Sequence, residues 1–231
     1  MTITLITGAN KGLGRETARR LIEQGHTVYI GARDPERGAT AARELNAELL
    51  LLDVTDEESV SAAAAKLEAE HGRLDVLVNN AGVPGRFLPP AQTTAAGMLA
   101  VYDTNVFGVV RVTHAMLPLL ERSAAPVVVN VSSGMGSLGV TTDPERFEST
   151  LTGLAYPSSK SAVNMLTSQY AKAYPKMRIN AVDPGYTATD LNGHRGIQTV
   201  AEGAEIIVRM ATIGPDGPTG TFTDRHGVVP W

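Results

Sequence analysis

Residues 3–21 read ITLITGANKGLGRETARRL, a short apolar run followed by three closely spaced glycines and an amphipathic pattern. Ile and Thr dominate the first part, as in a strand, and the apolar spacing after Gly14 is typical of a helix. Gly8, Gly12 and Gly14 permit a tight turn and a close approach of the backbone to a ligand. The free N–H groups at the start of the helix favour an anion there. This stretch therefore predicts a strand, a phosphate-binding turn and a helix.

The same alternation of strand and helix continues along nearly the whole chain. Apolar or β-branched runs predict strands at 3–7, 27–32, 47–54, 74–80, 126–132, 178–184 and 220–225. Amphipathic patterns predict helices at 12–24, 36–45, 56–71, 95–122, 157–174 and 199–213. Because helical crossovers join parallel strands, this order indicates a doubly wound α/β fold of Rossmann type. We expect one three-layer domain over residues 1–231, with a parallel seven-stranded sheet and helices on both faces.

Four loops rich in Gly, Pro and Ser follow the ends of predicted strands, at 8–14, 82–95, 133–155 and 185–198. In a doubly wound sheet, ligands bind beyond the carboxyl ends of the strands, where the strand order reverses. We therefore place a dinucleotide phosphate at the first loop and the substrate at the other three.

The composition excludes several function classes. The 231 residues are 43% hydrophobic and 19% charged, which is ordinary for a globular domain. The net charge of −4 and the absence of Lys/Arg clusters disfavour a nucleic-acid partner, and no apolar run is long enough to span a membrane. Cysteine is absent, which excludes disulfides and thiolate chemistry and fits a cytoplasmic location. The five histidines lack metal-ligand spacing, so we predict no metal site.

The end of the second predicted strand, GARD at 31–34, bears on which dinucleotide binds. An acid at this point binds the ribose 2′-hydroxyl of NAD, whereas cations suit the 2′-phosphate of NADP. Ala32 occupies the position that we assign to the acid, Arg33 follows it, and Lys11 in the first loop can add a second positive charge. Asp34 leaves NAD(H) open, because a small shift in register brings its carboxylate near the ribose. We predict NADP(H) as the preferred cofactor, with NAD(H) possible.

Residues 154–166 read LAYPSSKSAVNML and place Tyr156 and Lys160 four residues apart as a helical pattern begins. Residues at this spacing share a helix face, so both side chains can point into one cleft. A free phenol has a pKa of about 10, and a cation within a few ångströms lowers it by about 1–3 units. The pair predicts a tyrosine acid/base whose pKa is lowered by Lys160 and by an oxidised nicotinamide. The alternative is a simple helix start, with Pro157 in the first turn and Lys160 in solvent.

These features occur together with other motifs in a fixed order. The set is TGANKGLG at 7–14, LDVT at 52–55, NNAG at 79–82, NVFG at 105–108, NVSS at 130–133, YPSSK at 156–160 and PGYTAT at 184–189. In this combination the chain resembles the short-chain dehydrogenases/reductases over nearly its whole length. The GANKG loop, the ARD tip and the GTF…W tail are similar to the carbonyl reductase branch, which the family associates with NADPH.

The resemblance implies roles for particular residues. It makes Tyr156 the general acid/base, Lys160 its electrostatic helper and ribose ligand, Ser133 the donor to the carbonyl oxygen, and Asn105 the link to a proton-relay water. Asp53 and Val54 then border the adenine, Asn80 and Gly82 the ribose region, and Thr187 with Thr189 the nicotinamide amide. The complete set of predicted cofactor contacts is Gly8, Asn10, Lys11, Gly12, Leu13, Gly14, Arg33, Asp53, Val54, Asn80, Gly82, Tyr156, Lys160, Pro184, Gly185, Thr187 and Thr189.

Several of these assignments have alternatives. Ser132 competes with Ser133, although strand alternation lets only one of them face the substrate. Asn105 is alternatively a helix cap or kink, and Asp53 an ordinary turn residue at a strand end. Position 187 holds Thr where the family often has an aliphatic residue. The segment before Tyr156 is longer than in the compact members of the family, so extra structure must protrude there.

We expect an NADP(H)-dependent oxidoreductase that transfers hydride between the nicotinamide and a carbonyl or secondary alcohol substrate. Apolar residues in the substrate loops favour a medium-sized ketone, aldehyde or quinone, whereas Arg86 or Arg195 can meet a carboxylate. The alternative is an NADP(H)-binding redox sensor or scaffold without turnover, although such proteins typically lose the tyrosine or the lysine. Family members commonly pair through the helices that match 95–122 and 157–174, so the resemblance implies a homodimer or homotetramer. The longer segment before Tyr156 resembles that of monomeric carbonyl reductases, so a monomer stays open.

Overall fold

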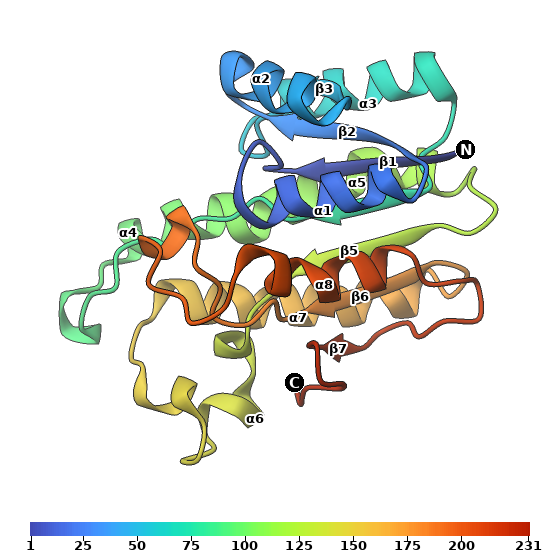
Figure 1. The fold of residues 1–231 in the computed structure, drawn as a ribbon. Coiled ribbons are helices and arrows are strands. Elements are labelled where there is room, and N and C mark those ends of the chain that lie inside the picture. The colour runs from blue at the N-terminus through green and yellow to red at the C-terminus, as the bar shows by residue number, and fades with distance from the viewer.

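Seven parallel strands form one sheet in the computed structural model, which describes residues 1–231 (Figure 1). The strands are β1 (Thr2–Thr7), β2 (His26–Ala32), β3 (Glu48–Leu51), β4 (Val76–Asn79), β5 (Val127–Val131), β6 (Arg178–Val182) and β7 (Phe222–Thr223). Their order in the sheet is β3-β2-β1-β4-β5-β6-β7. The order reverses between β1 and β4, which is where a doubly wound sheet opens its ligand site. The predicted fold class is confirmed.

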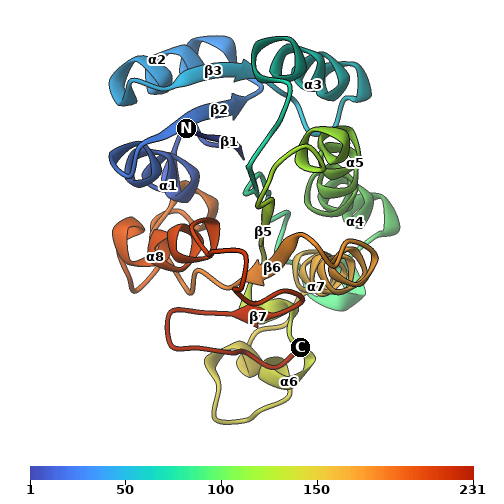
Figure 2. The ribbon, with the colours of Figure 1, turned by 90° about the vertical axis from the view of Figure 1, so that its right-hand side faces the viewer.

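Helices cover both faces of the sheet (Figure 2). One face carries α1 (Gly12–Glu23), α2 (Pro35–Leu45) and α8 (Val200–Ala211). The other carries α3 (Glu57–His71), α5 (Gly108–Leu120) and α7 (Ala155–Ala173), with α4 (Ala95–Tyr102) beside them. A helix of the length and apolar character needed to cross a membrane is absent from the structure.

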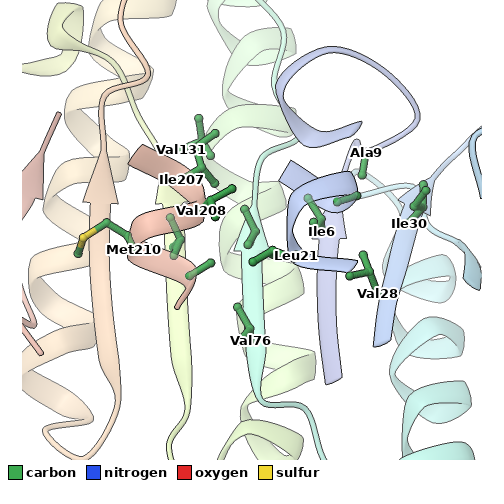
Figure 3. Close-up of a cluster of buried hydrophobic side chains, with 14 of the residues drawn as sticks. Ile6, Ala9, Leu21, Val28, Ile30, Val76, Val131, Ile207, Val208 and Met210 are labelled. Carbon is green, nitrogen blue, oxygen red and sulfur yellow. The ribbon is translucent and has the colours of Figure 1, made fainter. Parts of the chain in front are cut away.

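Two apolar layers hold the sheet between these helices. In one layer, Ile6 of β1 packs with Leu21 of α1 and Ile207 of α8, and all three are fully buried (Figure 3). In the other, the neighbouring strand residue Leu5 belongs to the core formed with α3 and α5. Successive residues of β1 thus enter opposite layers, as expected for a parallel strand that is covered on both faces.

Five predicted strands are shorter in the structure than in the sequence pattern, and two of them lose half of their length or more. The run at 47–54 forms a strand only at Glu48–Leu51, and the run at 220–225 only at Phe222–Thr223. In each case an aspartate turns the chain after the strand, because its carboxylate accepts backbone N–H groups that follow it. Asp53 accepts from Thr55, and Asp224 accepts from the two residues at 226 and 227.

The helix predicted at 95–122 is broken into three parts. Between α4 and α5 lies η2 (Asp103–Phe107), a π-helical segment that contains Asn105. Single π-helical turns within helices often mark functional positions. Asn105, one of the predicted site residues, therefore lies at a type of helix irregularity that is common at functional sites.

Extra structure lies in the long segment before Tyr156, as expected. It contains η3 (Gly134–Gly136), α6 (Leu138–Thr141) and η4 (Phe147–Thr150). This part protrudes beyond the β7 edge of the sheet (Figure 1), where the carbonyl of Trp231 accepts the Gly139 N–H at 3.1 Å. The other two substrate loops each contain a short helix, η1 (Pro90–Gln92) and η5 (Asp190–Asn192).

Candidate active site

Tyr156 and Lys160 lie in the first turns of α7, which begins at Ala155 rather than at the predicted residue 157. The Lys160 ammonium lies 5.6 Å from the centre of the Tyr156 ring. Lys160 is only 5% exposed, and its ammonium donates to the Val131 carbonyl at 2.8 Å. Lys160 is therefore a buried base attached to the end of β5 and not a solvated charge on a helix surface.

The two serines after β5 point in different directions. Ser132 is buried, and its hydroxyl donates to Asn164 Oδ1 at 2.5 Å and to the Lys160 carbonyl at 3.3 Å. Ser133 begins η3 instead, and its hydroxyl lies close enough to the Tyr156 phenol to lower the pKa of that group. Ser133 is thus the serine beside Tyr156, whereas Ser132 attaches β5 to α7.

Burial sets the pKa values of the catalytic pair. It raises the pKa of Tyr156 to about 12, an effect that the Ser133 hydroxyl opposes and the nearby Asp183 charge increases. Burial also lowers the pKa of Lys160 to about 8, with Asp183 acting in the opposite direction. The prediction that Lys160 lowers the phenol pKa is therefore wrong for the protein chain alone. Removal of the phenol from water disfavours its charged form, and the Lys160 ammonium is not among the groups that shift this pKa.

Asn105 and Gly82 lie close to Lys160. Asn105 is 1% exposed, accepts the Val83 N–H at 2.8 Å, and donates to the Val83 carbonyl at 3.0 Å and to Ser159 Oγ at 3.1 Å. A β carbon on Gly82 would lie 3.4 Å from Asn105 Oδ1 and 3.7 Å from Lys160 Nζ. The structure brings these three residues together, and it also shows Asn105 holding the segment after β4 in place.

The glycines of the first loop are required by its geometry. Gly8 and Gly12 have φ values of +63° and +56°, in the left-handed region. A β carbon on Gly14 would lie 2.5 Å from Asn80 Nδ2 and 2.9 Å from the Cα of Ala9. The Asn80 amide donates to the Thr7 carbonyl at 2.8 Å and to the Gly8 carbonyl at 3.2 Å. Asn80 therefore supports the loop from the end of β4.

Lys11 joins the first loop to the loop at 185–198. Its ammonium forms a salt bridge of 2.8 Å with Asp190, which also contacts His194 at 2.8 Å. Both partners of the first pair are more than half exposed. Lys11 is thus ion-paired, and not the free cation that its position in the sequence suggested. Of its neighbours, Asn10 is half-buried and Leu13 packs against the apolar core.

Arg33 and Asp34, at the tip of β2, have different surroundings. Arg33 is exposed and forms no salt bridge. Asp34 caps α2, because its carboxylate accepts the N–H groups of Glu36 and Arg37 at 3.0 Å each. A carboxylate used for capping is less available to a ribose hydroxyl. The structure thus weakens the case for Asp34 as an NAD-binding acid.

The end of β3 holds the two residues predicted to border the adenine. Asp53 Oδ1 accepts both the N–H and the hydroxyl of Thr55, at 3.0 and 2.8 Å, so the residue does act in a strand-end turn. Val54 is buried, and a β carbon on Gly108 would lie 2.9 Å from its Cγ2. Val54 therefore packs against the start of α5.

The segment after β6 uses one of its two threonines internally. Thr187 is 4% exposed, donates to the Pro184 carbonyl at 3.2 Å and accepts from Gln198 Nε2 at 2.8 Å. Its hydroxyl is therefore engaged within the loop, and its contact with a nicotinamide amide stays a prediction. Thr189 is half-buried, and its methyl group faces the first glycine-rich loop. Gln198, which no motif indicated, joins the two ends of this loop.

No sequence motif predicted the cavity of about 490 Å³ that lies beside this segment. Asp183 lines it and is 7% exposed, while the rings of Phe147 and Tyr186 in its wall lie 6.2 Å apart. An acid at the end of an apolar strand, directly before Pro184 and Gly185, was the available signal for Asp183. Groups of three or more His, Asp or Glu side chains arranged to hold a metal ion are absent from the structure.

Comparisons with known proteins agree with this geometry. The model of the short chain dehydrogenase family matches residues 2–199. (−)-Isopiperitenone reductase of Mentha piperita is 34% identical, and the alignment covers 96% of this chain and 95% of that protein. Salutaridine reductase of Papaver bracteatum is 32% identical over 97% of this chain and 94% of that protein. The structure of NADPH-bound carbonyl reductase from chicken fatty liver has a TM-score of 0.87 at 28% identity, with complete coverage of both chains.

The sheet order, the glycine-rich first loop and the tyrosine–lysine pair define an oxidoreductase of the Rossmann class. More narrowly, the chain belongs to the short-chain dehydrogenase/reductase family, in its carbonyl reductase-like branch.

Proposed function

We propose that the protein is an NADP(H)-dependent reductase of carbonyl compounds, or in the reverse direction a dehydrogenase of secondary alcohols, with Tyr156 as general acid/base. The observation that carries this proposal is the meeting of Ser133, Tyr156 and Lys160 at the carboxyl end of β5. The similar proteins add support, because two are named reductases and one carbonyl reductase was solved with NADPH bound.

The first loop fits the phosphates of a dinucleotide. Gly8, Gly12 and Gly14 leave three of its positions without side chains, and the N-terminus of α1 offers unpaired N–H groups to an anion. Arg33 and Lys11 are the cations proposed for the 2′-phosphate, which is why we propose NADP(H) rather than NAD(H). When bound, this cofactor supplies the hydride in reduction and accepts it in oxidation.

Side chains of the protein would donate the proton and replace it. In reduction, the Tyr156 hydroxyl donates a proton to the carbonyl oxygen, and the Ser133 hydroxyl donates a hydrogen bond to the same oxygen. One such donor contributes up to about 3 kcal/mol to the transition state. With a pKa of about 8, Lys160 is mostly charged at neutral pH and stabilises the phenolate that remains. Asn105, next to Lys160 and Gly82, is the residue proposed to hold the water that returns the proton.

Apolar carbonyl compounds of medium size are the proposed substrates. The Phe87 ring lies 6.1 Å from the Tyr156 ring, and Phe87 is 53% exposed, so it offers an apolar surface next to the reacting group. The Phe147 and Tyr186 rings provide a second apolar surface. Arg195 donates to the Asn192 carbonyl at 3.0 Å, which makes it a weaker candidate for a substrate carboxylate than the exposed Arg86.

The substitution Tyr156→Phe tests the proposed function. With neutral ketones, aldehydes and quinones as substrates, we expect kcat for NADPH oxidation to fall by about 10²- to 10⁴-fold. The affinity for NADPH and the Tm should stay close to wild type, because only a hydroxyl is removed. Tyr170→Phe, on the same helix, is the matched control and should keep full activity. NADH assayed in parallel tests the cofactor preference.

Undiminished turnover by the phenylalanine variant would contradict the proposed role of Tyr156. NADPH binding without turnover on any carbonyl compound would favour a redox sensor or scaffold instead. Activity confined to carboxylated carbonyl compounds would contradict the apolar substrate class.

A further inference from the structure

Asp183 is the only buried acid of the chain, as Lys160 is the only buried base. It directly follows β6, is 7% exposed, and forms no salt bridge. A buried carboxylate is unfavourable unless hydrogen bonds compensate for the lost water. The contacts of Asp183 therefore indicate what this carboxylate does.

Both contacts are with the backbone of loops at the proposed active site. Asp183 Oδ1 accepts the N–H of Gly185 at 2.9 Å, and the nearby backbone N–H of Gly134 helps to lower the pKa of this carboxyl. A β carbon on Gly134 would lie only 2.9 Å from Asp183 Oδ2, so the carboxyl packs directly against that residue. Gly134 follows Ser133, and Gly185 begins the segment predicted to face the nicotinamide. One side chain thus connects the two loops.

The surroundings of Asp183 are acidic. Burial raises its pKa, the N–H groups of Gly185 and Gly134 oppose this, and the charges of Glu148 and Asp224 add to the increase. Glu148 is paired with Arg146 at 3.5 Å. The remaining charged or titratable groups that line the cavity are Tyr186, Arg225 and His226.

Asp183 also acts on the catalytic pair at a distance. Its charge raises the pKa of both Tyr156 and Lys160. The Ser133 hydroxyl, which the adjoining loop carries, lowers the pKa of Tyr156. Asp183 is therefore connected to Tyr156 both through the Ser133 loop and through its charge.

We propose that Asp183 is a positioning residue, whose carboxyl holds the backbone of Gly134 and Gly185 and thereby keeps the Ser133 hydroxyl beside Tyr156. This inference rests on the proposed function. The far end of this loop is held to α7, because the Gly136 carbonyl accepts from Ser161 at 2.8 Å and from Asn164 at 3.2 Å. At the near end, the Ser133 hydroxyl has only a local hydrogen bond, from the Met135 N–H at 3.2 Å, so the contact of Asp183 with Gly134 is what fixes this end. A donor to a developing oxyanion acts only within a narrow range of distance, so a loosened loop lowers kcat.

The substitution Asp183→Asn tests the proposal, since the amide keeps one acceptor oxygen and loses the charge. We expect kcat to fall about tenfold, while the KM for NADPH stays within about twofold. In Asp183→Asn two effects on the phenol oppose each other, because loss of the negative charge lowers the pKa of Tyr156 and displacement of the Ser133 hydroxyl raises it. The pH dependence is therefore measured in a second variant that keeps the charge. Asp216→Asn, an exposed carboxylate on the loop after α8, is the control and should change neither quantity.

A second variant covers the case in which Asp183→Asn does not fold. Gly134→Ala leaves the carboxyl in place but puts a methyl group 2.9 Å from its oxygen. It should produce the same loss of kcat with NADPH affinity retained. In alcohol oxidation, which needs the phenolate, the rise of kcat with pH should move to higher pH in this variant, because the charge of Asp183 remains while the Ser133 hydroxyl that lowers the pKa of Tyr156 is displaced. Wild-type kcat in a folded Asp183→Asn protein would overturn the proposal. A loss of kcat in Gly134→Ala without the shift in pH dependence would also overturn it, because that is the result of a merely structural role.

The same assay separates this inference from the proposed function. Turnover by the wild type that is lost in Tyr156→Phe establishes the function first. If the wild type turns over no carbonyl compound, the proposed function fails, and crystal structures of wild type and Asp183→Asn then test the positioning role alone. A Ser133 hydroxyl that stays beside Tyr156 in the variant would overturn it, whereas a displaced hydroxyl would support it.

Discussion

Lys160 is a charged residue that is buried, which is unfavourable for its ammonium group. Its ammonium is almost inaccessible and has one hydrogen bond, to the Val131 carbonyl. Burial lowers its pKa from 10.5 to about 8, so the charged form is less favourable in the folded than in the unfolded protein. At neutral pH the lysine is charged in both states and therefore reduces the free energy of unfolding.

We predict that Lys160→Met abolishes activity but stabilises the protein by about 1–2 kcal/mol at pH 7. The gain should be complete below pH 8 and should disappear between about pH 8 and 10.5, where Lys160 loses its proton in the folded state before it does so in the unfolded state. Urea denaturation at pH 7 and pH 10 measures this change. Lys172→Met, an exposed lysine of the same helix, should show no such gain. A variant less stable than wild type at pH 7 would contradict the prediction.

The first loop and the start of α1 depend on backbone space that only glycine leaves. Gly14→Ala would place its methyl group 2.9 Å from the Cα of Ala9 and 3.0 Å from the Gly8 carbonyl oxygen. We predict a loss of about 1–3 kcal/mol in stability and at least a tenfold weaker binding of NADPH, measured by fluorescence titration. Gly97→Ala in α4 is the matched control, since its methyl group would meet only Thr94 Oγ1, at 3.5 Å. It should be neutral or stabilising, and equal effects of both substitutions would contradict the steric explanation.

The Lys11–Asp190 salt bridge joins the first loop to η5, and it competes with the proposed contact of Lys11 to the 2′-phosphate. We predict that Asp190→Asn strengthens NADPH binding about two- to fivefold at low salt and leaves NADH binding unchanged. The effect should shrink as salt screens the exposed charges. Glu44→Gln, which removes an equally short exposed pair with Arg15 on α1, serves as control. Weaker NADPH binding by Asp190→Asn would show instead that Asp190 orients Lys11 for the phosphate.

Association of two copies of the chain depends on whether the side of the molecule formed by α4, α5 and α7 is accessible. Leu99 of α4 and Met165 of α7 are 60% and 61% exposed, and α4 and α7 lie side by side on that side of the molecule (Figure 2). The protruding segment with α6 lies at the β7 edge and does not cover these helices (Figure 2). We therefore predict a homodimer through α4, α5 and α7.

Light scattering should give about twice the 24.4 kDa mass of one chain. Leu99→Glu combined with Met165→Glu should reduce it to the monomer, because charges in an apolar contact are unfavourable. Leu138→Glu on α6, where the leucine is 71% exposed, should leave the mass unchanged. A wild-type mass of one chain at all concentrations would contradict the dimer. The cytoplasmic location suggested by the absence of cysteine stays a prediction.

The order of strands and helices could be predicted well from the sequence, because periodicity and turn residues act between near neighbours. The ends of elements were predicted less well. The strand at 220–225 stops early because Asp224 accepts backbone N–H groups from the next residues. The helix at 95–122 is interrupted where the Asn105 side chain reaches across to Val83, a partner that no local pattern reveals.

By itself the sequence determined the doubly wound sheet, the glycine-rich first loop and the nearness of Tyr156 to Lys160, since each depends on residues only a few positions apart. Tertiary structure alone decided that Ser132 bonds to Asn164 of α7, that burial raises the pKa of the phenol, and that Lys11 is paired with Asp190. It also brought Asp183 against Gly134. The reason is physical: loss of water and contacts between distant segments arise only when the chain packs.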